Sequence, residues 1–193
     1  MGKFLLLADI HANEEALRAV LNDAGTINGI WCAGDIVGYG PRPNEVCNIL
    51  REYDTVAVGG NHDLSAVGRF DPHHMHGAAL SCIEQHIEVL TEDNKQWLQG
   101  MPEYRFVGPK RQGVETLVMV HGRPTPKYCL DYICSASDAL IAANDIALGN
   151  PLRSHHAIFG HTHIPAIWKV VLNASNGDDA VTDLLVHGHV ALS

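Results

Sequence analysis

Cationic side chains are scarce in this sequence, and they form no run: Lys and Arg total 13 against 22 Asp and Glu, which gives a formal net charge of −9. Without a basic stretch, we expect neither non-specific nucleic-acid binding nor adsorption to an anionic membrane. The balance still permits a small phosphorylated substrate, because a bound metal ion can supply local positive charge.

Paired cysteines and long hydrophobic runs are also missing. The five cysteines form no C-x-x-C pair, which argues against a disulfide scaffold and predicts a reduced, cytoplasmic protein. The apolar stretch after Lys3 ends at Asp9, too short for a signal peptide, and no other stretch is long enough to span a membrane. With 193 residues, 46% of them hydrophobic, the chain suits one domain over residues 1–193.

Apolar periodicity predicts an alternation of strands and helices. The first part contains predicted strands at 3–8, 29–33 and 55–58 and predicted helices at 13–24 and 44–53. This order implies right-handed βαβ units and a largely parallel sheet, hence an α/β fold. Further along we expect helices at 76–90, 92–99 and 136–148, and strands at 104–107, 115–120, 157–160, 164–172 and 181–186. The last helix opens with a capping-box pattern, Ser135 to Asp138.

Histidine stands out among the polar residues, because its 13 copies equal Lys and Arg together and imidazole is a common metal ligand. Five segments rich in such ligands each follow a predicted strand: Asp9-Ile10-His11, Gly34-Asp35, Gly59-Gly60-Asn61-His62-Asp63, His121-Gly122 and Gly160-His161-Thr162-His163. Loops beyond the carboxyl ends of strands line the crevice of an open α/β sheet, so we expect the segments to converge. Asp9 and His11 would point the same way if the backbone there were extended.

The converging side chains offer oxygen and imidazole nitrogen: Asp9, His11, Asp35, Asn61, His121, His161 and His163. Such a mixed set suits Mn, Fe or Zn better than Ca. These ligands are too many for one tetrahedral metal site, but they suffice for two metal ions if one carboxylate bridges the two. Two metals about 3.5–4 Å apart clamp the attacking and leaving oxygens of an in-line displacement and lower the pKa of bound water toward ~7. A chance collection of buried polar residues is the alternative, but unpaired buried carboxylates are costly.

In chain order the segments read D-x-H, G-D, G-N-H-[DE], H and G-H-x-H. With this pattern the sequence resembles the calcineurin-like metallophosphoesterase superfamily. The full sequences of segments 9–13, 34–41 and 160–165 resemble its small bacterial phosphodiesterase-like branch. The resemblance implies a four-layer α/β/β/α sandwich with two mixed sheets. It also implies one metal held by Asp9, His11, Asp35 and His163, a second held by Asp35, Asn61, His121 and His161, and His62 as the catalytic histidine.

The activity implied is that of a metal-dependent phosphoesterase with two divalent ions, Mn favoured and Fe, Zn or Ni as alternatives. A two-metal-activated hydroxide would attack small phosphodiesters or nucleotides. Gly38 and Tyr39 replace the Asp and Arg of the superfamily's protein phosphatases, which argues against that class. A phosphomonoesterase, a dinucleoside polyphosphatase and a non-catalytic protein-binding scaffold of the same fold stay open. The ending at 186–190 departs from the branch's usual final turn.

Two residues are candidates for substrate contact. Tyr39 lies in the second ligand-bearing loop, and Arg123 follows His121-Gly122, although a solvated arginine is an equal alternative there. For the histidines at 73, 74 and 76 we expect a solvated loop, with the mouth of the active site as the alternative. For His62 the alternative to catalysis is a structural, hydrogen-bonded histidine.

Overall fold

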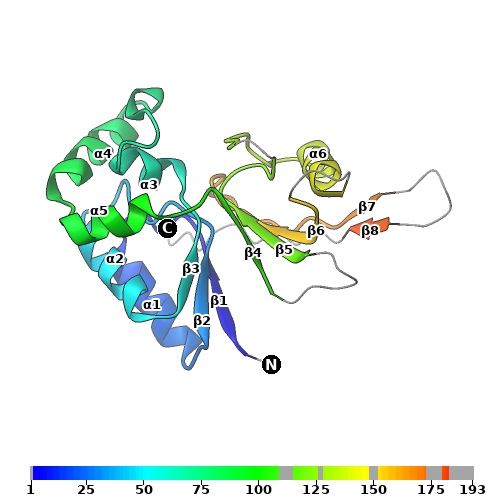
Figure 1. The fold of residues 1–193 in the computed structure, drawn as a ribbon, viewed down its shortest axis with the longest axis horizontal. Coiled ribbons are helices and arrows are strands. Elements are labelled where there is room, and N and C mark those ends of the chain that lie inside the picture. Colours follow the sequence, from blue (N-terminus) through cyan, green and yellow to red (C-terminus); the bar gives the residue numbers. More distant parts are fainter. Residues whose placement is uncertain (1, 109–114, 126–127, 148–151, 173–179, 183–193) are drawn as a thin grey trace.

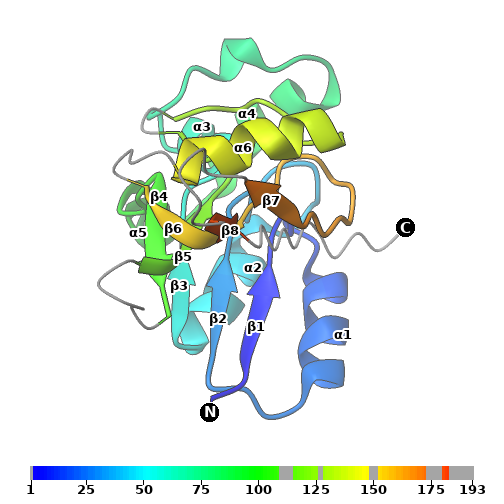
Figure 2. The ribbon, with the colours of Figure 1, turned by 90° about the vertical axis from the view of Figure 1, so that its right-hand side faces the viewer.

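The strands predicted at the start of the chain form a parallel sheet. The computed structural model describes residues 2–108, 115–125, 128–147, 152–172 and 180–182. Strands β1 (Phe4–Leu7), β2 (Gly29–Cys32) and β3 (Thr55–Ala57) pair in the order β1-β2-β3, all parallel. In Figure 2 their arrows point toward the end of the molecule where α3, α4 and α6 lie.

A second sheet has the order β4-β5-β6, with strands β4 (Tyr104–Val107), β5 (Glu115–Val120) and β6 (Ser154–Ile158). Strand β4 runs antiparallel to β5, and β6 runs parallel to it. The predicted mixed character is therefore confirmed for this sheet, whereas the described strands of the first sheet are all parallel. Strands β7 (Val170–Leu172) and β8 (Ala180–Thr182) form a separate antiparallel pair.

Helices cover the outer faces of the two sheets (Figure 1). The helices are α1 (Glu14–Ala24), α2 (Pro43–Glu52), α3 (Asn61–Ala66), α4 (Ala78–Val89), α5 (Glu92–Gln99) and α6 (Ala136–Ala147), with a 3₁₀ turn at Pro72–His74. Local signals explain where they start: Asn13 Oδ1 accepts the backbone N–H of Ala16 at the head of α1, and Ser135 Oγ accepts that of Asp138 at the head of α6.

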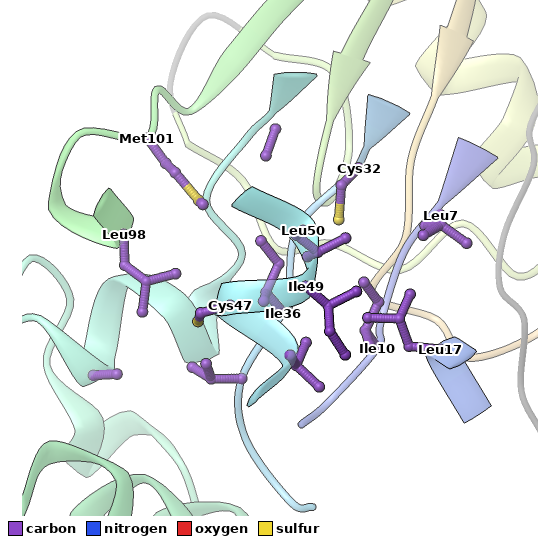
Figure 3. Close-up of a cluster of buried hydrophobic side chains, with 14 of the residues drawn as sticks. Leu7, Ile10, Leu17, Cys32, Ile36, Cys47, Ile49, Leu50, Leu98 and Met101 are labelled. Atoms are coloured by element: carbon purple, nitrogen blue, oxygen red, sulfur yellow. The ribbon is translucent and has the colours of Figure 1, made fainter. Parts of the chain in front are cut away.

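Three hydrophobic clusters hold the layers together. The first lies between the first sheet and its helices, and Figure 3 shows Leu7 and Cys32 of the strands gathered with Ile49 and Leu50 of α2. The second lies between the second sheet and α6. The third brings together side chains of both sheets, Trp31 of β2 and Met119 of β5 among them, so the sheets pack face to face. The order of layers is thus helices, sheet, sheet, helix.

Two predicted strands differ from the structure, and one helix was not predicted. Strand β6 begins at Ser154 and includes His155 and His156, whereas the predicted strand begins after them. These polar residues do not show the apolar pattern of a buried strand, although both histidines are half-buried. Residues 164–169 form no strand, and Ile164 and Ile167 are exposed. Helix α3 was not expected, because it is short and begins with polar ligand-type residues.

Within the described ranges, no helix combines the length and apolarity needed to cross a bilayer. The predicted strand at 181–186 is described only up to Thr182, where it forms β8. The segment at 186–190 lies outside the described residues.

Candidate metal centre

The ligand-bearing segments follow the carboxyl ends of β1, β2, β3, β5 and β6, and the structure brings them together. Two groups of side chains have ligand atoms within 4.8 Å of one another: Asp9, His11, Asp35 and His163 form one, and Asp35, His121 and His161 form the other. Asn61 Oδ1 lies 3.2 Å from His121 Nε2, beside the second group. Asp35 belongs to both groups, so it occupies the position of a bridging ligand.

Backbone strain is concentrated at these side chains. The described non-glycine residues with positive φ are Asp9, His11, Ala12, Asp35, Tyr39, His161 and His163. Most of them are candidate ligands, and each such residue costs on the order of 1–3 kcal/mol, which the surrounding structure must offset. The condition of an extended backbone at Asp9 and His11 is not met, because the pair converges through left-handed residues instead. The loops are held by hydrogen bonds between them, such as that from the N–H of His11 to the carbonyl oxygen of Asp35 at 3.0 Å.

The Asp35 carboxylate is fully buried at the centre of the site. Its Oδ1 accepts the backbone N–H of His62 at 2.9 Å. Its Oδ2 lies 3.2 Å from His121 Nε2 and 3.7 Å from His11 Nε2. Gly60 makes this approach feasible, because a Cβ at that position would lie 2.1 Å from Asp35 Oδ1.

Backbone carbonyls orient the imidazoles. His11 Nδ1 lies 3.0 Å from the carbonyl oxygen of Val37, and His121 Nδ1 lies 2.8 Å from that of Ala33. The His161 ring likewise hydrogen-bonds the Leu130 carbonyl. When Nδ1 of His11 and His121 carries the proton and donates it to these oxygens, each Nε2 presents a lone pair to the centre of the site. Such outer contacts set the tautomer of metal-binding histidines.

Two buried carboxylate oxygens at the centre lack a donor, which is the observation that tests for a metal. Asp9 Oδ2 and Asp35 Oδ2 are buried and accept no hydrogen bond from the described residues. Beside them, His11 Nε2 and the exposed His163 Nε2 lie within hydrogen-bonding distance, 2.9 Å apart. A buried carboxylate without a partner is costly, and divalent cations satisfy this mixture of oxygen and nitrogen. The residues present therefore fit two divalent metal ions.

The charges of the groups agree with this fit. Burial lowers the pKa of His11 and of His161 to about 4, so both rings are neutral at pH 7, as metal ligands must be. Burial alone would raise the pKa of Asp35, but His121 outweighs it and keeps that pKa far below its usual range. Burial would lower the pKa of His121, yet Asp35 and Asp9 raise it to about 9, so a metal ion bound at this ring would displace a proton. The space between Asp35 and His121 thus attracts positive charge.

His62 lies at the start of α3, next to the two groups of ligands. Its ring centroid is 4.8 Å from that of His11 and 4.9 Å from that of Tyr39. Its Nδ1 is buried and has no hydrogen-bond partner among the described residues. A Cβ at position 38 would lie 2.2 Å from this atom. Gly38 therefore lets the loop press against the ring, and this packing orients it.

Sequence reasoning gave no role to Asp63 and His86, which hold the loops of the site. The buried Asp63 carboxylate accepts the backbone N–H groups of Ile36, Val37 and Gly60 at 2.9–3.0 Å. Asp63 belongs to the third motif, so its place in that motif could have indicated a role at the site.

His86, on α4, accepts the N–H of Gly38 at Nδ1 (3.0 Å), and its Nε2 donates to the carbonyl oxygen of Gly40 (2.9 Å). Burial lowers the pKa of His86, in keeping with this neutral tautomer. Nothing in the sequence separates His86 from the other histidines.

A cavity of about 450 Å³ opens over the centre. Tyr39, 46% exposed, lines it, a position from which it could contact a substrate. His74 and His76 are exposed and also line it, which favours the alternative of a loop at the mouth of the site. Arg123 does not line it: its guanidinium pairs with Asp131 and, at 3.1 Å, with Asp145. Arg123 thus ties the segment after β5 to α6.

Comparison with known proteins gives a family match over most of the chain. The model of the calcineurin-like phosphoesterase superfamily domain matches residues 3–177. Among solved structures, that of a metallophosphoesterase from Sphaerobacter thermophilus superposes with a TM-score of 0.67 and 32% identity, covering 95% of this chain and 67% of that one. This similarity supports the arrangement of the two three-stranded sheets described above.

Two curated relatives are longer than this chain. The uncharacterized protein MJ0912 of Methanocaldococcus jannaschii is 30% identical over 168 residues, which are 84% of this chain and 63% of that protein. A symmetrical bis(5'-nucleosyl)-tetraphosphatase of Baumannia cicadellinicola subsp. Homalodisca coagulata is 28% identical over 177 residues, with 84% of this chain and 55% of that protein covered. The chain therefore spans less than two thirds of the length of either relative.

Proposed function

The chain belongs to the calcineurin-like phosphoesterase superfamily, and from this premise we propose that it is a metal-dependent phosphodiesterase acting on small phosphodiesters or nucleotides. The observation that carries the proposal is the pair of ligand groups that share Asp35. We assign Asp9, His11, Asp35 and His163 to one ion and Asp35, Asn61, His121 and His161 to the other. Manganese is the ion we favour, with iron, zinc or nickel as alternatives, because this ligand set accepts them all.

Two bound divalent ions would supply Lewis-acid polarisation of the phosphoryl oxygens and a water of lowered pKa. The chain's own part is to hold and orient the ligands. Asp35 reaches both groups from one loop, and hydrogen bonds to the carbonyls of Val37 and Ala33 orient the rings of His11 and His121. Ligands held this firmly need little reorganisation as charge develops on the phosphate.

His62 is the residue we assign to the leaving oxygen. It lines the cavity, and burial lowers its pKa, so the ring is neutral at pH 7 and carries one N–H. That N–H donates to the leaving or phosphoryl oxygen of a bound phosphoester. Gly38, Tyr39 and His11 surround the ring and limit its rotation.

Hydrolysis of a dinucleoside polyphosphate is the second candidate, because one relative carries the name of a tetraphosphatase. The replacement of the protein-phosphatase Asp and Arg by Gly38 and Tyr39 disfavours phosphoprotein substrates. We further propose a cytoplasmic protein, in line with its five free cysteines, with a small phosphorylated substrate as partner and no membrane or non-specific nucleic-acid binding.

The test is hydrolysis of bis(p-nitrophenyl) phosphate by chelator-treated protein with and without added Mn²⁺. We expect turnover that depends on the metal and is absent in Asp35→Asn. p-Nitrophenyl phosphate, run beside it, separates a diesterase from a monoesterase. Absence of turnover on both substrates with Mn²⁺, Zn²⁺ and Ni²⁺, while metal is bound, would contradict the proposal and favour a protein-binding scaffold.

A further inference from the structure

Part of the cavity wall is aromatic and apolar. The ring of Phe70 lies 5.6 Å from that of His74 and 6.1 Å from that of Tyr128. Phe70 and His74 line the cavity together with Met75, which is 7% exposed. Phe70 is half-buried and His74 is exposed, so both side chains have surface available for contact with a ligand.

Tyr132 supplies a second aromatic surface at the same cavity. It is 58% exposed, and its ring stacks on that of His161 with centroids 4.5 Å apart and an angle of 7° between the planes. Tyr39, 46% exposed, also lines the cavity and contacts the rings of His11 and His62. A group attached to a phosphate at the metal centre would therefore extend into a space walled by rings.

The charge of the lining narrows the ligand class further. Among the described residues that line the cavity, there is no lysine or arginine, and Asp35 is the sole carboxylate. Arg123 follows the candidate ligand His121 by two positions, but its guanidinium is paired with Asp131 and Asp145. Apart from the metal ions that the ligands would hold, these residues offer no lysine or arginine to a second or third phosphate. A substrate with one anionic phosphate and an uncharged planar substituent fits this lining better than a polyphosphate chain.

We infer that Phe70, His74 and Met75, with Tyr132 stacked on the candidate ligand His161, form a subsite for the planar base of a nucleoside phosphodiester. The inference rests on the proposed function and deepens it by naming the substrate class. A cavity of about 450 Å³ lies within the range of roughly 300–1,000 Å³ typical of small-molecule sites. Stacking of a base on an aromatic side chain contributes enough to change kcat/KM by about tenfold.

Two esters with the same leaving group test the inference: the p-nitrophenyl ester of thymidine 5'-phosphate and p-nitrophenyl methyl phosphate. Both carry one negative charge and release p-nitrophenolate, so they differ in the group offered to the subsite. We expect the manganese-loaded enzyme to show a kcat/KM at least about tenfold higher for the thymidine ester. The ratio of the two values is independent of the fraction of active protein.

Variants then assign the preference to the subsite. Phe70→Leu keeps an apolar side chain and removes the ring, and His74→Ala removes an exposed ring; both should lower the ratio toward one, while Phe70→Tyr should keep it. Tyr53→Ala, at an exposed tyrosine outside the cavity, is the matched control and should leave the ratio as it is. A ratio near one in the unsubstituted enzyme, or a ratio that survives both Phe70→Leu and His74→Ala, would overturn the inference and leave the phosphodiesterase standing. Failure to hydrolyse either ester would overturn the proposed function and this inference with it.

Discussion

Asp35 and His62 are neighbours with different assigned tasks, which makes them separable by substitution. Asp35 touches both ligand groups, whereas His62 meets Asp35 through its backbone N–H and lines the cavity with its ring. We predict that Asp35→Asn loses bound metal and activity together. His62→Ala should keep its metal and lose about 10²- to 10⁴-fold in kcat, the range typical of a general acid or base. Metal analysis by plasma mass spectrometry, combined with steady-state kinetics, checks both.

Metal loss in His62→Ala would mean that the ring supports the centre and not the chemistry. His76→Ala, at a cavity-lining position with no assigned ligand role, serves as the control for general effects of removing a histidine from this region.

At the residue scale, the identity of the candidate ligands followed from motif spacing, but their conformation did not. The left-handed φ of Asp9, His11 and Asp35 depends on hydrogen bonds between loops that lie far apart in sequence. The same limit applies to Arg123, because its partners Asp131 and Asp145 become neighbours only when the segment after β5 packs against α6. Local patterns name the residue types, and tertiary contacts decide their geometry.

At the scale of elements, α4 supports the loop that presses on His62. His86 of α4 holds Gly38 and Gly40 by two hydrogen bonds, and Gly38 packs against the His62 ring. We predict that His86→Ala lowers kcat by about 10- to 100-fold, as is usual for residues that position catalytic groups. KM and metal content should change little. His86→Asn, whose amide oxygen can accept the Gly38 N–H, should recover part of kcat; a loss of metal in His86→Ala would contradict this role.

The start of α6 offers a pH test of stability. Hydrogen bonds from the Ser135 hydroxyl and from the N–H groups of Cys134 and Ser135 lower the pKa of Asp138 below its ordinary 3.8. A carboxyl group whose pKa is lower in the folded state stabilises the fold above the unfolded-state pKa, and this contribution is lost as pH falls through the folded-state pKa.

We therefore predict that Asp138→Asn lowers the free energy of unfolding at pH 7, and that its difference from the unsubstituted protein shrinks between pH 5 and pH 3. Urea unfolding at a series of pH values measures it. A difference that stays constant over this range would show that the charge of Asp138 contributes nothing to α6.

Most elements were predictable from local signals because their apolar faces repeat at the expected spacing. The strands at Tyr104–Val107 and Glu115–Val120 and the helix α5 match the predicted limits. The start of β6 was missed because Ser154 to His156 look polar, although pairing with β5 makes them a strand. Pairing with a distant strand leaves no local signal in such a sequence.

At the scale of the whole molecule, the metal centre joins the two sheets. Asp9, Asp35 and Asn61 follow strands of the first sheet, and His121 and His161 follow strands of the second. Ions bound by both sheets stabilise the native state, by about 2.7 kcal/mol when free metal is a hundred times its Kd. We predict that chelation lowers Tm by about 5–10 °C and that Asp35→Asn shows no such shift. Equal Tm values for chelated and manganese-loaded protein would contradict a centre that links the sheets.

The most direct measurement is anomalous diffraction from crystals of the full chain grown with Mn²⁺. Our account predicts two peaks roughly 3.5–4 Å apart, both in contact with the Asp35 carboxylate, one beside His11 and His163 and the other beside His121 and His161. A single peak, or peaks that do not touch Asp35, would contradict the two-metal centre on which the proposed activity depends.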